Sequence, residues 1–152
     1  MRIISGIAKG RRLKSVPGTS TRPTADKVKE AIFSMIGPYF DGGIALDLFA
    51  GTGALGIEAL SRGMDRAIFV DVDKKCIEVI RYNLRAAGLE KQAEVYRNEA
   101  ARAVKVLGKK DLRFDLVFID PPYRLHIVED LLLTMERAGL TYRDTTIVVE
   151  QD

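Results

Sequence analysis

Five short apolar runs alternate along this chain with stretches in which apolar residues recur at helical spacing. A strand, a helix and a second strand in succession make the two strands parallel, and repeated units build a sheet covered by helices on both faces. The alternation therefore predicts an α/β fold with a mostly parallel, doubly wound sheet. Its ligand should lie at the carboxyl ends of the strands, where the strand order reverses. The expected strands lie near 44–49, 66–71, 92–97, 114–119 and 145–150. The expected helices lie near 25–36, 54–62, 74–87, 99–107 and 125–138.

The first predicted strand runs into a glycine-rich string with glycines at 51, 53 and 56. The first two would let the backbone turn tightly beside a ligand, and Gly56 would let the next helix pack against the sheet. This spacing is equally that of a dinucleotide-binding turn. Asp47 favours a different ligand, because a carboxylate there repels a pyrophosphate but suits an ammonium group. S-adenosylmethionine is such a ligand. The candidate residues of this segment for binding S-adenosylmethionine are Asp47, Phe49, Ala50, Gly51, Thr52 and Gly53.

The next two predicted strands also end in polar side chains. Asp71 lies twenty residues after Gly51, where this kind of fold reads a ribose diol, so we expect it to bind the ribose. Asp73 is interpreted as the N-cap of the following helix. Asn98 and Glu99 follow the third strand and could meet an adenine edge. Glu99 could instead be a first-turn acid that suits the helix dipole.

The fourth predicted strand is followed directly by Asp120-Pro121-Pro122-Tyr123. Proline fixes φ and cannot extend a ladder, so the two prolines would hold the preceding carboxylate rigidly at the sheet edge. The exocyclic amine of a nucleobase is a weak nucleophile because its lone pair is delocalised into the ring. Asp120 and the Pro121 carbonyl could accept its N–H hydrogens and favour the positive charge that develops as it attacks, while Tyr123 could stack on the base. All four residues are candidate catalytic residues. The alternative is an ordinary strand-to-loop turn.

Positive charge is concentrated in the first 29 residues, which hold eight basic residues against the single acid Asp26, although the whole chain carries only +3. Such a basic stretch suits a phosphate backbone. Its pattern over 2–8 and 11–16, around Lys9-Gly10, predicts a β-hairpin. The alternative is a solvated hairpin with ordinary surface charge. The candidate RNA-binding residues are Arg2, Lys9, Arg11, Arg12, Lys14 and Arg22.

Composition narrows the classes of protein further. Cys76 and His126 are the only cysteine and histidine, which excludes an internal disulfide and a zinc site built from them. No apolar run is long enough for a membrane span, and no secretory signal is present. We therefore expect a cytoplasmic protein with no metal and no membrane partner. Its 152 residues predict one domain over 1–152, with 1–24 as a basic hairpin appendage. The oligomeric state stays open.

Taken together, these segments resemble the bacterial 16S rRNA guanine-N2 methyltransferases of the RsmD type. The resemblance implies a Rossmann-like class I methyltransferase fold and S-adenosylmethionine as cofactor. It also implies methyl transfer to the N2 amine of one guanine in 16S rRNA, within an assembling small ribosomal subunit. By the same resemblance Asp47, Gly51, Gly53, Asp71 and Glu99 surround the cofactor. The segments that carry it are Arg2-Ile3-Ile4-Ser5-Gly6, Arg22-Pro23-Thr24, Ala31-Ile32-Phe33, residues 47–63 and Asp120-Pro121-Pro122-Tyr123.

The chain departs from that family at its end. Members of the family continue past the fifth strand with two more strands, whereas this sequence stops at Glu150-Gln151-Asp152. Either the sequence is a shortened one, or the sheet lacks its final antiparallel strands; we expect these strands to be missing here. The alternative functions are DNA adenine-N6 or protein glutamine-N5 methylation, because the same acceptor geometry serves any planar amine or amide. A non-catalytic, cofactor-binding RNA-associated module is a further alternative, although Asp120 and Tyr123 favour an enzyme.

Overall fold

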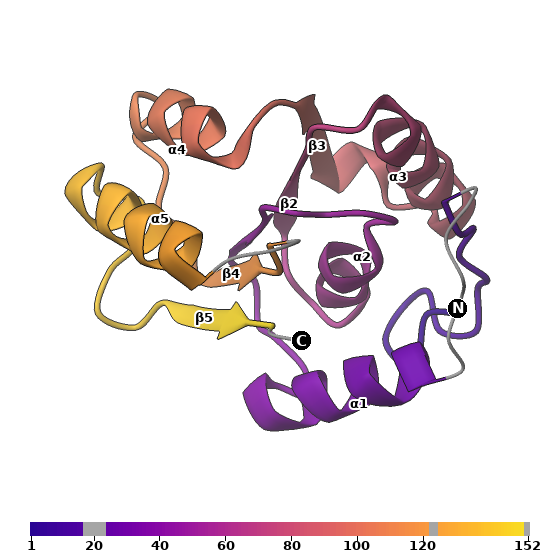
Figure 1. The fold of residues 1–152 in the computed structure, drawn as a ribbon. Helices are drawn as coiled ribbons and strands as arrows, with labels where there is room; N and C mark the ends of the chain where they lie inside the picture. Colours follow the sequence, from indigo (N-terminus) through magenta and orange to yellow (C-terminus); the bar gives the residue numbers. More distant parts are fainter. Residues whose placement is uncertain (17–23, 122–124, 151–152) are drawn as a thin grey trace.

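A five-stranded sheet with the order β3-β2-β1-β4-β5 forms the centre of the molecule, and every strand pairing in it is parallel (Figure 1). The computed structural model describes residues 1–16, 24–121 and 125–150. The strand order reverses between β1 and β4, which confirms the predicted doubly wound sheet and puts the expected crevice at the carboxyl ends of these two strands. The strands are β1 Ile44–Asp47, β2 Arg66–Asp71, β3 Ala93–Arg97, β4 Leu116–Ile119 and β5 Thr146–Val149.

Helices cover both faces of the sheet: α1, α2 and α3 lie on one face, and α4 and α5 lie on the other (Figure 1). Each of the five strands expected for the sheet and each expected helix is present, with ends within two residues of the predicted ones. No helix in the described ranges combines the length and the apolar character that crossing a lipid bilayer requires. The helices are α1 Thr24–Ile36, α2 Ala54–Ser61, α3 Lys74–Ala87, α4 Ala100–Gly108 and α5 Leu125–Arg137, with a 3₁₀ turn, η1, at Glu90–Gln92.

Strand β4 illustrates why a continuous apolar run forms a central strand here. All four of its residues are buried. Leu116 and Phe118 pack into the core under α1, α2 and α3, whereas Val117 and Ile119 pack into the core under α4 and α5. Successive side chains of a strand point to opposite faces, so a strand with helices on both sides needs apolar residues at every position. The two cores hold the carboxyl ends of β1 and β4 side by side.

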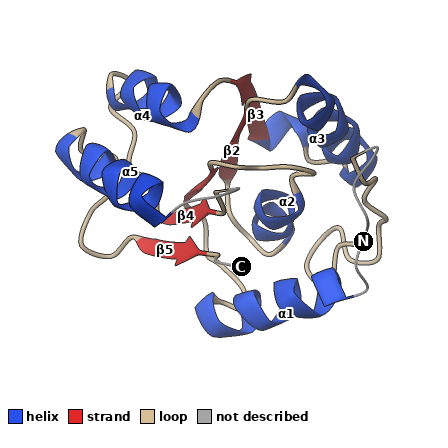
Figure 2. Cartoon of the chain, viewed as in Figure 1, coloured by secondary structure: helices blue, strands red, loops and turns tan. Residues whose placement is uncertain are grey.

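The N-terminal segment 1–16, which we call the arm, differs from the β-hairpin that we predicted. Its residues form a single antiparallel bridge, between Arg2 and Arg12, and the two expected strands are absent from it. Figure 2 accordingly draws the arm as a loop. The chain does reverse direction as expected, since the N–H of Gly10 donates to the carbonyl of Ile3 at 2.8 Å. The predicted strands were wrong, while the predicted return of the chain is present.

Some backbone donors of the arm bind α2 and not the facing part of the arm, which limits the pairing within the arm to the bonds around the Arg2–Arg12 bridge. The N–H groups of Ile4 and Ser5 donate to the carboxylate of Glu58 at 2.9 and 3.0 Å. The N–H of Ile7 donates to the carbonyl of Ser61 at 2.9 Å. A ladder needs these donors on the facing strand, so the arm packs on the helices and not as a ribbon.

Candidate active site

A tight turn follows β1 and begins α2. The N–H of Gly53 donates to the carbonyl of Ala50 at 2.7 Å. Gly51 has a φ of 59°, and a Cβ at this position would meet no atom within 4 Å, so this side of the turn opens onto free space. A Cβ at Gly56 would lie 2.4 Å from the ring of Phe69. Position 56 therefore needs glycine for the close packing of α2 on β2 that the spacing predicted.

Asp71, the last residue of β2, supports this turn. Its Oδ2 accepts the N–H of Gly51 at 2.9 Å, and its Oδ1 accepts the N–H of Asp73 at 2.9 Å. The side chain of Asp73 accepts the N–H of Lys75 at 2.8 Å, which confirms Asp73 as the N-cap of α3. Sequence reasoning missed the contact with Gly51. The partly exposed Asp71 carboxylate also has a side-chain hydrogen bond with Cys76, and it keeps lone-pair capacity for a further donor.

Asp47, the last residue of β1, is an almost fully buried acid with an exposed fraction of 3%. Its Oδ2 accepts the N–H of Gly56 at 3.2 Å. The pKa of Asp47 is raised to about 7, first by burial and then by the negative charges of Glu150, Asp120 and Asp71, against the lowering effect of the Gly56 hydrogen bond. These charges act because four strand ends bring their acids to one edge of the sheet. The edge therefore favours a cationic ligand group.

The end of β4 lies at the same edge. Asp120 follows β4 directly and is exposed, and Pro121 is half-buried. The carbonyl of Phe118 accepts the N–H of Leu48 at 3.1 Å, and the carbonyl of Ile119 accepts the N–H of Glu150 at 3.0 Å. The predicted catalytic residues Pro122 and Tyr123 lie outside the described residues.

The residues after β3 lie next to Asp71. The N–H of Asn98 donates to the Asp71 carbonyl at 3.0 Å, and the Oδ1 of Asn98 accepts the N–H of Glu99 at 2.9 Å. Asn98 also lines a cavity of about 120 Å³. The largely exposed carboxylate of Glu99 lies 3.9 Å from Nε of Arg102. The two roles weighed for Glu99 remain predictions. Phe49, half-buried after β1, packs against the core under α4 and α5.

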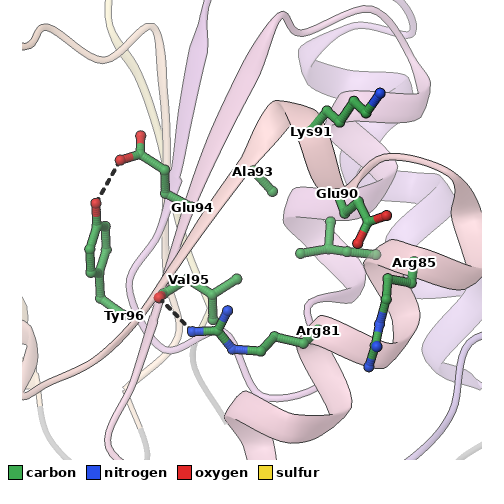
Figure 3. Close-up of a pocket in the computed structure, with 9 residues that line it drawn as sticks. Arg81, Arg85, Glu90, Lys91, Ala93, Glu94, Val95 and Tyr96 are labelled. Carbon is green, nitrogen blue, oxygen red and sulfur yellow. Dashed lines mark hydrogen bonds between the residues drawn. The ribbon is translucent and has the colours of Figure 1, made fainter.

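A larger cavity of about 530 Å³ lies between α3 and the edge strand β3 (Figure 3). The guanidinium of Arg81 donates to the carbonyl of Val95 at 3.3 Å, and the hydroxyl of Tyr96 donates to the carboxylate of Glu94 at 2.6 Å. None of the predicted site residues lines this cavity. The cavity is therefore separate from the carboxyl end of the sheet, where the acids at the strand ends lie.

The basic residues of the arm are exposed where the structure describes them. Nη1 of Arg11 donates to the carbonyl of Ala86 at 2.7 Å, and Nζ of Lys14 lies 5.2 Å from the ring centroid of Tyr82, so the arm lies along α3. Arg22 lies outside the described residues. The exposed basic residues of the arm are Arg2, Lys9, Arg11, Arg12 and Lys14.

Sequence reasoning missed a buried charged cluster under the arm. The carboxylate of Glu58, with no exposed surface, lies 3.3 Å from Nζ of Lys29 and accepts the Nε–H of Arg62 at 2.8 Å. Lys29 is itself buried and also donates to the carbonyl of Arg2 at 2.7 Å. Burial lowers the pKa of Lys29, and the charge of Glu58 opposes that shift. A usable signal was Glu58, the single charged residue in the predominantly apolar segment 54–61.

Comparisons with known proteins agree on one family. The family described as Conserved hypothetical protein 95 matches residues 1–152. YlbH of Bacillus subtilis, provisionally named an rRNA methyltransferase, is 55% identical over all of this chain and 83% of its own length. Ribosomal RNA small subunit methyltransferase D of Escherichia coli is 33% identical over all of this chain and 75% of its own. The solved structure of E. coli YhhF, provisionally named a methyltransferase, has a TM-score of 0.84 and 34% identity, covering 98% of this chain and 80% of that one.

Proposed function

The chain belongs to the family described as Conserved hypothetical protein 95, which includes ribosomal RNA small subunit methyltransferase D. From that premise we propose that it transfers a methyl group from S-adenosylmethionine to the exocyclic N2 amine of a guanine in 16S rRNA. One observation carries the proposal: Asp120 follows β4 at the point where the strand order reverses, and its charge acts on Asp47 beside the glycine turn. A base amine and a cofactor bound there would meet.

The residues at this edge fit S-adenosylmethionine. The free space over Gly51 lets a ligand approach the backbone of the turn. Asp47, buried and with the Gly56 N–H as its hydrogen-bond donor, suits the ammonium group of the cofactor. Asp71 keeps lone-pair capacity for a ribose hydroxyl, and Asn98 is held next to it. When bound, the cofactor supplies an electrophilic methyl group.

The role of Asp120 follows from the electronics of the substrate amine. The N2 lone pair of guanine is conjugated with the ring, and the nitrogen becomes positive as it attacks the methyl group. We assign Asp120 and the carbonyl of Pro121 as acceptors of its two N–H hydrogens, an arrangement that stabilises the charge that develops in the transition state. Tyr123 is assigned the stacking contact with the base.

The arm provides the proposed RNA-binding surface. Its exposed arginines and lysines would contact phosphates without reading the base, which positions the RNA over the sheet edge. Two relatives named for rRNA methylation support an rRNA substrate over DNA or protein. Such a substrate would bring the protein to assembling small subunits in the cytoplasm.

Mass spectrometry of digested 16S rRNA tests the proposal in cells. A strain that lacks the gene should lose one N2-methylguanosine, and expression of the intact gene should restore it. Unchanged guanosine methylation in the deletion strain would contradict the proposed substrate.

Cofactor affinity should depend on the protonation of Asp47. Because its pKa is about 7, the carboxyl must lose a proton when an ammonium group binds beside it at lower pH. The Kd for S-adenosylhomocysteine should therefore fall by up to about tenfold per pH unit between about pH 5.5 and 7 and level off above. Calorimetry across this range measures it. Asp47→Asn should bind S-adenosylhomocysteine more weakly at pH 7.5, and its Kd should no longer depend on pH. The same pH dependence in the variant as in the wild type would mean that Asp47 is not the titrating group.

The same shift has the opposite sign for the stability of the free protein. The folded-state pKa of Asp47 lies above its ordinary value of 3.8, so the unfolded chain releases this proton first as pH rises. The contribution of Asp47 to the free energy of unfolding should decrease from about pH 4 to about pH 7 and stay constant above.

The charges of the arm should govern RNA affinity and its salt dependence. Replacing Arg11, Arg12 and Lys14 with alanine should weaken RNA binding. It should also reduce the magnitude of the slope of log K against log salt by about 2 to 3, because a complex with three fewer phosphate contacts releases fewer counterions. Filter binding at several salt concentrations measures both. A matched control removes three exposed charges from the other face of the sheet, and it should leave the slope unchanged. The control positions are Arg102, Lys105 and Lys109. Equal salt slopes in the two triple variants would mean that the arm has no special role in RNA binding.

A further inference from the structure

Asn83, a fully buried residue of α3, joins the arm to the glycine turn. Its Oδ1 accepts the N–H of Lys14 at 2.7 Å. Its Nδ2 donates to the carbonyl of Lys14 at 3.1 Å and to the carbonyl of Thr52 at 2.9 Å. One side chain therefore holds the backbone of a basic arm residue and the backbone of the turn between Gly51 and Gly53.

The orientation of this amide is determined by its partners. Both Nδ2 hydrogens meet carbonyl oxygens, and Oδ1 meets an N–H, so a reversed amide would oppose like groups at all three contacts. A buried amide with every contact satisfied is rigid, because each lost hydrogen bond would leave a backbone group without a partner. Asn83 is therefore a direct hydrogen-bonded link between the backbone of Lys14 and the carbonyl of Thr52.

Resting on the proposed function, we propose that Asn83 is a positioning residue that couples RNA on the arm to cofactor in the glycine turn, so that each ligand tightens the other. RNA that contacts Arg11, Arg12 and Lys14 restricts the arm. Through Asn83 the restriction extends to Thr52, and the turn then loses less freedom when the cofactor binds. Coupling of binding free energies is reciprocal, so bound cofactor favours RNA by the same factor.

Equilibrium dialysis of labelled S-adenosylhomocysteine measures the coupling with the full chain. The second ligand is the small-subunit particle from a strain that lacks the gene. In the wild-type protein, saturating particles should tighten S-adenosylhomocysteine at least about fivefold. In Asn83→Ala the ratio of the two Kd values should fall to about one. Without cofactor, particles should slow amide exchange at Gly53 in the wild type and not in Asn83→Ala.

Ser61→Ala is the matched control for the arm. Oγ of Ser61 accepts the N–H of Ala8 at 3.0 Å and donates to the carbonyl of Ser5 at 2.7 Å, so it anchors the arm without touching the turn. This variant should weaken RNA binding and keep the wild-type coupling ratio. A coupling loss equal to that of Asn83→Ala would mean that any loosening of the arm has this effect, and the specific role of Asn83 would be wrong.

A second pair of variants tests the contact from the side of the arm, at the exposed residue Lys14. Lys14→Ala removes the ammonium group and keeps the backbone N–H that Asn83 accepts. Lys14→Pro removes both. The proline variant should lose the coupling that the alanine variant retains, and equal coupling in the two would overturn the inference.

The failures of the two proposals are distinguishable. A wild-type protein that binds both ligands with no change in either Kd contradicts the coupling and leaves the proposed function intact. A wild-type protein that binds no S-adenosylhomocysteine contradicts the proposed cofactor, and the coupling with it.

Discussion

Replacing Asp120 with alanine should lower the single-turnover rate of methyl transfer about 10²–10³-fold and leave cofactor affinity near the wild-type value. The loss should fall on the chemical step because Asp120 accepts a hydrogen of the amine whose positive charge develops only during attack. Asp120 is exposed at the end of β4, so its removal leaves no cavity in the core. Its charge also helps to raise the pKa of Asp47, so removing it favours the ionised form of Asp47 that an ammonium group needs.

The assay is transfer of labelled methyl to small-subunit particles at about pH 8, where Asp47 is ionised in all variants. Asp120→Asn should lose less activity than Asp120→Ala, because the amide oxygen still accepts one hydrogen bond without the charge. If Asp120→Ala binds the cofactor and transfers methyl at the wild-type rate, Asp120 has no catalytic role and the segment that it begins is only a turn. Equal losses in both variants would mean that the charge, and not the acceptor, carries the effect.

Replacing Glu58 with alanine should lower the free energy of unfolding by about 3–5 kcal/mol. Glu58 has no exposed surface and faces the buried cations Lys29 and Arg62. Its carboxylate also accepts the N–H groups of Ile4 and Ser5. The variant leaves two buried cations without their anion and two arm N–H groups without an acceptor. The pKa of Lys29, already lowered by burial, should fall further.

Urea unfolding followed by circular dichroism measures this loss. Glu94→Ala is the control, because its ion pair with Arg66 and its hydrogen bond from Tyr96 are open to solvent, so the loss should be well below that of Glu58→Ala. Glu58→Gln should lie between the two, because its amide oxygen still accepts one bond. A loss in Glu58→Ala no larger than in Glu94→Ala would mean that the arm is not held by this cluster.

The sheet could be predicted because its determinants are local. The run 116–119 is apolar at every position, as a strand covered on both faces requires, and strands that follow one another through helices are parallel. Asp47, Asp71 and Asp120 could then be placed at one edge, since parallel strands end together. The effect of Asp71 and Asp120 on the pKa of Asp47 agrees with that placement.

The arm could not be predicted in the same way because its partners are distant in the chain. Ile3 and Ile4 are β-branched residues of the kind enriched in strands, yet the N–H of Ile4 donates to Glu58, 54 positions away. Asn83 occupies the apolar face of α3, and its partners Lys14 and Thr52 come from two separate segments. Periodicity reports which face of a helix is buried, and it does not report which backbone groups meet a polar residue there.

The central claim is methyl transfer from S-adenosylmethionine to a guanine N2 amine of 16S rRNA, and a reconstituted reaction tests it most directly. Purified protein, isotopically labelled S-adenosylmethionine and small-subunit particles from a strain that lacks the gene are incubated together. The rRNA is then digested to nucleosides for mass spectrometry. We expect about one labelled N2-methylguanosine per particle with the wild-type protein and almost none with Asp120→Ala. Label on adenine or on ribosomal protein, or no label at all with cofactor bound, would contradict the claim.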